Sequence, residues 1–64
     1  MKAWQERVIL EKKELDEKLI KLLAFILSQD FLHIYISKQK GLLKEQYNTM
    51  MEYSEILRDR ISGF

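Results

Sequence analysis

Apolar residues recur through the first half of the chain at helical spacing. Four of them follow one another every seven residues: Met1, Val8, Leu15 and Leu22. Further large apolar residues stand three or four positions after members of this series: Trp4, Leu19, Phe25 and Ile26. Such spacing places side chains on one face of an α-helix. The pattern predicts a helix over about residues 2–27.

The second half of the chain carries a similar stripe. Its members are separated by alternating steps of four and three residues: Leu43, Tyr47, Met50, Ser54, Leu57, Ile61 and Phe64. This alternation, held over three heptads, is typical of a coiled-coil contact. Ser37 is a candidate N-cap, and Gly63 suits a helix stop. A second helix is predicted over about residues 38–62.

A corner over about residues 28–37 joins the two helices. Two sets of side chains alternate in it: Phe31, His33 and Tyr35 with Leu32, Ile34 and Ile36. Alternation suits a short strand, but a lone strand in a helical chain would leave its backbone groups unpaired. A helical turn or compact corner is therefore favoured. The predicted fold is all-α, a single domain over residues 1–64 built as an antiparallel two-helix hairpin.

The chain holds more apolar side chains than one hairpin covers. The expected core comprises Trp4, Val8, Leu15, Leu19, Leu22, Phe25, Leu43, Tyr47, Met50, Leu57 and Ile61. A second set is left over and is assigned to contacts between subunits: Ile20, Leu23, Leu27, Phe31, Ile34, Tyr35 and Ile36. A helix that is apolar all round is buried all round, and a chain of this size hides only about 60% of its surface alone. We expect self-association into an oligomeric helical bundle.

Composition narrows the function. Cysteine is absent and His33 is the one histidine, so neither disulfides nor a metal site are expected, and no cofactor. Lys and Arg number 11 against 10 Asp and Glu, a balance that argues against sequence-specific binding to nucleic acid. The longest low-charge run, residues 22–36, is shorter than the roughly 20 residues of a membrane helix. With no signal-peptide pattern, a cytoplasmic location is expected.

Catalysis is not expected. General acid–base chemistry usually needs a carboxylate or histidine in a cleft with a shifted pKa. The carboxylates here alternate with lysines on outer helical faces, and His33 is interpreted as a corner residue. No glycine-rich phosphate loop is present. No catalytic residue is assigned.

One end of the predicted hairpin gathers aromatic and basic side chains. An antiparallel fold brings the two chain ends together, and with them five residues: Trp4, Arg7, Tyr53, Arg60 and Phe64. Aromatic faces stack on bases, and guanidinium groups bind phosphate in a bidentate manner. These five are the candidate ligand site. The alternative is an arginine rim around a terminal Trp–Phe plug.

The frame of the chain resembles a family of very small phage and prophage proteins, labelled crAss001-related. The similar positions are mostly apolar heptad residues; the more specific ones are Gln5, Arg7, Gln46, Tyr53 and Arg60. The chain departs from the family over residues 37–41, Ser-Lys-Gln-Lys-Gly, where the family has an acidic start to the second helix. The resemblance implies a phage accessory protein, a class that includes inhibitors of bacterial immunity.

Three functions are compatible with these features. The first is a phage anti-defence sponge, an oligomer of hairpins that sequesters a nucleotide immune signal. The second is an inhibitor that binds a host defence protein, as anti-CRISPR proteins do, through the apolar corner. The third is a structural or assembly protein of the phage. The sponge is the preferred interpretation.

Overall fold

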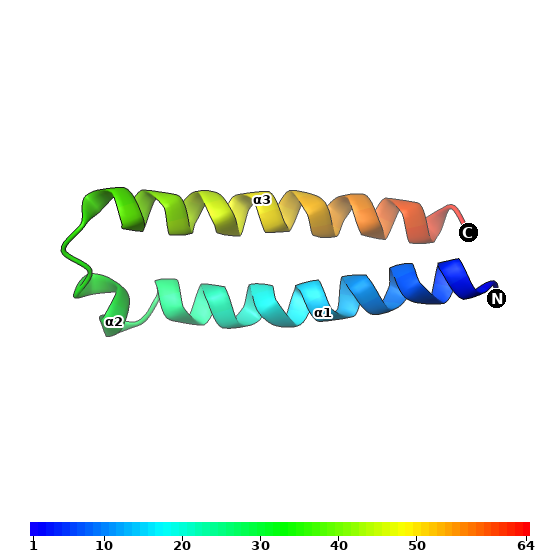
Figure 1. Ribbon diagram of the computed structural model, residues 1–64, viewed down its shortest axis with the longest axis horizontal. Coiled ribbons are helices and arrows are strands. Elements are labelled where there is room, and N and C mark those ends of the chain that lie inside the picture. The colour runs from blue at the N-terminus through cyan, green and yellow to red at the C-terminus, as the bar shows by residue number, and fades with distance from the viewer.

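Two long helices lie side by side in opposite directions. The computed structural model describes residues 1–64 and contains α1 (Ala3–Ile26), a short α2 (Gln29–Leu32) and α3 (Ser37–Ser62). Both chain ends lie at one end of the molecule, and α2 lies at the other (Figure 1). The molecule measures 47 × 15 × 14 Å, so it is a rod about three times as long as it is wide. The predicted all-α antiparallel hairpin is confirmed.

The helix ends differ in their caps. The backbone N–H of Lys2 donates to Oε1 of Gln5 at 3.0 Å, which satisfies one donor before α1. At the start of α3, Ser37 is the first helical residue and Ile36 occupies the cap position without a side-chain bond. The expectation of Ser37 as N-cap is therefore wrong. Gly63 follows the last residue of α3 in a right-handed conformation, so its freedom to adopt positive φ is not used.

The corner consists of one helical turn followed by extended residues. Ser28 caps α2: its hydroxyl accepts from the N–H of Phe31 at 3.4 Å and donates to the carbonyl of Phe25 at 2.6 Å. His33 ends the turn, and the chain then runs without helix to Ser37. The helical turn expected in place of a strand is present, and the N–H of His33 donates to the carbonyls of Gln29 and Asp30.

The core is a narrow strip between α1 and α3, here called the seam. Five residues are buried: Val8, Leu19, Phe31, Ser54 and Leu57. Most other expected core residues are half-buried in the seam: Leu15, Leu22, Leu43, Tyr47, Met50 and Ile61. Trp4 and Phe25 are instead more than a third exposed, because they lie at the edge of the strip. Two helices cover only the stripe that each turns to the other.

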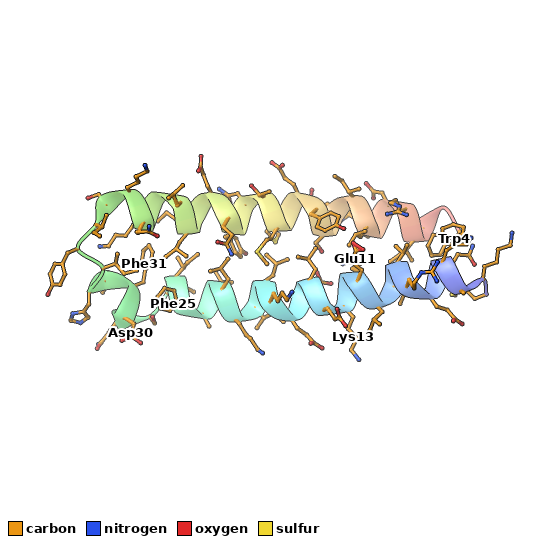
Figure 2. All side chains as sticks on the ribbon, viewed as in Figure 1. Trp4, Glu11, Lys13, Phe25, Asp30 and Phe31 are labelled. Atoms are coloured by element: carbon orange, nitrogen blue, oxygen red, sulfur yellow. The ribbon has the colours of Figure 1, made fainter.

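The corner end has its own small cluster. The rings of Phe25 and Phe31 meet edge to face, 6.3 Å apart (Figure 2). The ammonium groups of Lys40 and Lys44 lie 5.6 and 5.8 Å from the ring of Phe31. Two cations over one ring add to its apolar packing. This cluster fixes the corner on the hairpin.

No helix is both long enough and apolar enough to cross a membrane.

Candidate functional site

The open end of the hairpin carries an aromatic pair. Trp4 lies in the first turn of α1 and Phe64 follows the last turn of α3, so the antiparallel fold joins them. Their rings meet edge to face with centroids 5.2 Å apart. Trp4 is 45% exposed and Phe64 41% exposed, so each keeps an open ring surface. Figure 2 shows Trp4 at this end, away from the Phe25–Phe31 cluster.

A second contact between the helices lies further along the same side. The hydroxyl of Tyr53 on α3 donates to the carboxylate of Glu11 on α1. Tyr53 is 43% exposed, so this contact holds the hydroxyl while part of the residue stays open to solvent. Glu11 stands seven residues, or two turns, after Trp4, which places both contacts on one side of the hairpin.

Two arginines lie between these contacts. Arg7 is three residues after Trp4 and four before Glu11, and Arg60 is four before Phe64 and seven after Tyr53. Each therefore shares a helical face with the contact residues on its own helix. The two ion pairs of the structure are Lys12–Asp16 and Arg58–Asp59, so neither Arg7 nor Arg60 has a carboxylate partner.

We call this side the arginine flank, defined by Trp4, Arg7, Tyr53, Arg60 and Phe64. The fold places all five of these sequence-predicted residues along it. A guanidinium group without a carboxylate partner is free to bind an anion such as phosphate. Partly exposed aromatic rings along the same flank offer stacking surfaces. The flank is chemically suited to a ligand with phosphate groups and a flat ring.

The residues assigned to subunit contacts differ in exposure. Four are widely open: Ile20 at 70%, Leu27 at 77%, Tyr35 at 93% and Ile36 at 64%. Leu23 is 38% exposed and Ile34 is half-buried. Phe31 is only 6% exposed because it packs on Phe25 beneath the two lysines of α3. Phe31 is therefore covered by its own chain, which leaves it little surface for the subunit contact expected of it.

A polar layer in the middle of the seam was missed in the sequence. The ammonium group of Lys12 donates to Asp16 Oδ2 at 2.7 Å and to Ser54 Oγ at 3.0 Å. The Ser54 hydroxyl in turn donates to Asp16 Oδ1 at 2.5 Å. These bonds from Lys12 and Ser54 hold the pKa of Asp16 below its usual value. Ser54 is the one small polar member of the second stripe. The signal was Lys12 itself, which stands at a stripe position between Val8 and Leu15.

Next to the polar layer, the side of the hairpin opposite the arginine flank is hollowed. A first hollow of about 490 Å³ is lined by Ile9, Lys12, Lys13, Asp16, Glu17, Ile20 and Ile61. A second, of about 240 Å³, is lined by Asp16, Leu19, Ile20, Leu23, Tyr47 and Met51. The two share Asp16 and Ile20 and so form one groove. No group of three or more His, Cys, Asp or Glu side chains is placed to hold a metal ion.

Comparison with known proteins identifies one family. The model of the Sequestin family matches residues 2–63. No curated protein and no solved structure matches the chain. The resemblance drawn from the sequence likewise covered nearly the whole chain, but none of the comparisons bears the crAss001 label.

Proposed function

This chain belongs to the Sequestin family, and we propose that it sequesters a nucleotide immune signal of a bacterial host on behalf of a phage. The family name indicates proteins that capture a molecule rather than convert it. Capture needs a surface that binds, and the arginine flank offers one with phosphate-binding and base-stacking groups together. The unpaired state of Arg7 and Arg60 is the observation that carries the proposal.

The flank divides the binding between two kinds of contact. Arg7 and Arg60 bind the phosphate groups, because guanidinium donors match phosphate oxygens in pairs. Trp4 and Tyr53 supply ring faces for the base; each stacked base contributes about 1–3 kcal/mol in single-strand binding proteins. Glu11 holds the Tyr53 hydroxyl and so restricts the ring. Such a site binds without any chemical step.

Self-association is part of the proposal. Only five of 64 residues are buried, and large side chains such as Ile20 and Leu27 are more than two-thirds exposed. Monomeric proteins rarely leave contiguous apolar patches of this kind in water. Further copies of the chain cover them, as expected of an oligomeric sponge. Several binding flanks would then lie on one particle.

Calorimetry with a panel of cyclic dinucleotides and ADP-ribose isomers tests the ligand class. We expect one class to bind with nanomolar affinity, and the double substitution Arg7→Ala/Arg60→Ala to abolish the heat at the same protein concentration. The matched control is Arg58→Ala, which removes an arginine already paired with Asp59. A panel without any binding, or equal binding by the double variant, would contradict the proposal.

A second function is favoured by the corner. Leu32, Tyr35 and Ile36 are 70%, 93% and 64% exposed at the end of the hairpin far from the arginine flank. An apolar tip of this kind suits the groove of a host defence enzyme, as in helix-in-groove recognition. A chain that is monomeric by light scattering and captures one host enzyme, with capture lost in Tyr35→Ser, would favour this inhibitor over the sponge.

A further inference from the structure

The helix α1 carries a second stripe, displaced by one residue from the seam. Its members are again separated by steps of four and three: Ile9, Lys13, Asp16, Ile20, Leu23 and Leu27. At 3.6 residues per turn this stripe lies about 100° round the helix from Val8, Leu15 and Leu22. All of its members except Leu27 line the groove. A heptad stripe that α3 does not cover has the spacing of a helix–helix contact.

The α1 residues that line the first hollow form a symmetric pattern. When their order is reversed, apolar positions coincide with apolar positions and lysines coincide with carboxylates. In order they are Ile9, Lys12, Lys13, Asp16, Glu17 and Ile20. The midpoint of the set falls between Glu14 and Leu15. About this point Ile9 mirrors Ile20. Each lysine likewise mirrors a carboxylate, Lys12 with Glu17 and Lys13 with Asp16.

We propose that the groove is a two-fold interface with a second copy of this chain, in which the two α1 helices run antiparallel about an axis between Glu14 and Leu15. A two-fold contact is self-complementary, because residue i of one copy meets residue j of the other and the reverse. The mirrored set satisfies this condition at every position. An unrelated partner would have no reason to match such symmetry.

The charges of the hollow support this occupant. Lys13 and Glu17 line it, and neither makes an ion pair within its own chain. They stand four residues apart with the lysine first, the less favourable order for pairing along a helix. In the proposed register Lys13 lies level with the partner copy's carboxylate at position 16, which its own chain already pairs with Lys12. Glu17 lies level with that lysine, so lysines of one copy lie alongside carboxylates of the other.

The apolar residues of the groove fit the same register. Ile61 of α3 lines the first hollow beside Ile9. When Ile9 of one copy faces Ile20 of the other, Ile61 comes with it toward the part of the groove formed by Leu23 and Met51. Ile9, Leu23 and Met51 are each 38% exposed, so each keeps surface for this contact. In the dimer, isoleucine side chains from both copies therefore fill the first hollow.

This inference rests on the self-association proposed above and not on the ligand. The arginine flank lies on the other side of the seam from the groove, because Glu11 and Arg7 lie about 60° and 100° round α1 from Val8 in one direction and Ile9 lies about 100° in the other. A dimer joined through the groove therefore leaves both arginine flanks on its outer surfaces. Dimer formation and ligand binding are measured separately.

Disulfide trapping tests the register, and the chain has no cysteine of its own to interfere. Ile9→Cys and Ile20→Cys are prepared as separate full-length chains, mixed and oxidised. We expect the mixture to give a disulfide-linked dimer containing one chain of each kind. Ile20→Cys alone should give little dimer, because the two positions 20 lie 11 residues apart along the antiparallel helices, roughly 16 Å at 1.5 Å per residue. Circular dichroism checks that both variants remain helical.

The matched control is Ile56→Cys mixed with Ile20→Cys, since Ile56 is 56% exposed and outside the groove. Selective trapping of the 9–20 pair supports the interface. Equal trapping by Ile20→Cys alone, or by the control mixture, overturns it. A stable dimer in light scattering that never links positions 9 and 20 overturns this interface while self-association stands. A single chain at high concentration overturns both.

Discussion

The two flanks of the hairpin share one seam but differ in how their charges are arranged. The arginine flank carries two unpaired guanidinium groups between exposed aromatic rings. The groove carries lysines and carboxylates in equal number, spaced symmetrically among aliphatic side chains. Charge of one sign attracts a ligand of the other sign, whereas a mirrored set of both signs matches a copy of itself. Exposure alone would not have separated these two roles.

The largest effect should come from breaking the support that both flanks share. Leu57 is fully buried between the helices, and Leu57→Ala leaves a cavity that costs about 2–5 kcal/mol. A chain of this size has little stability in reserve. We expect thermal unfolding, followed by circular dichroism, to shift far downward, with loss of both ligand binding and self-association.

The neighbouring Ile56→Ala is the control for this change. Ile56 is 56% exposed, so its truncation should alter stability by less than about 1 kcal/mol. Equal effects at positions 56 and 57 would mean that the seam is not the shared support.

The hairpin could be predicted from the sequence because heptad spacing fixes which face of each helix is apolar. The spacing does not fix how wide the covered strip is. Trp4 and Phe25 were therefore placed in the core, although two helices leave them at its edge. Phe31 was placed outside because its packing depends on how the corner folds back onto Phe25.

The candidate ligand site could also be predicted in part. The five residues of the arginine flank could be grouped because an antiparallel hairpin must join its ends. The polar layer was not found, since Lys12 and Asp16 resemble surface charges until Ser54 is brought against them across 38 or more residues. The groove needs the relative rotation of the two helices, which only the folded chain supplies.

A smaller effect sharpens the assignment of the arginine flank. Arg60→Lys keeps the charge but loses the planar pair of donors that matches phosphate. We expect about tenfold weaker nucleotide binding by calorimetry, corresponding to roughly 1.4 kcal/mol, with no change in oligomeric mass. Unchanged affinity would mean that the flank supplies charge alone, and a changed mass would mean that the two flanks are not independent.

A change of charge in the groove should instead weaken self-association and leave nucleotide binding unchanged. Lys13→Glu places like charges against the carboxylate at position 16 of the second copy, twice in each dimer. Exposed ion pairs contribute about 0.2–1 kcal/mol each, so the loss of two should raise dimer dissociation about two- to thirtyfold, more at low salt. Sedimentation equilibrium measures this, with nucleotide binding unchanged.

Lys21→Glu makes the same charge change outside the groove and serves as the control. Equal weakening by both variants would indicate that net charge, rather than register, governs association.

The smallest effect concerns the polar layer that lies between the two flanks. Lys12 and Ser54 hold the pKa of Asp16 below 3.8, its ordinary value. The unfolded chain therefore binds a proton at this carboxyl at higher pH than the folded chain does, so its contribution to stability is complete above about pH 5 and is lost as the pH falls through the folded-state pKa. Because the Asp16 side chain is 41% exposed, solvent screening keeps this contribution small.

Asp16→Asn should unfold more easily than the unchanged chain at pH 7, and the difference in unfolding free energy between the two chains, here called the gap, should narrow steadily below pH 3.8. Urea unfolding of both chains across this range measures the gap. A gap independent of pH would mean that the hydrogen bonds to position 16 stabilise the seam without regard to charge, and the layer would then be a packing feature of the hairpin rather than an ionic one.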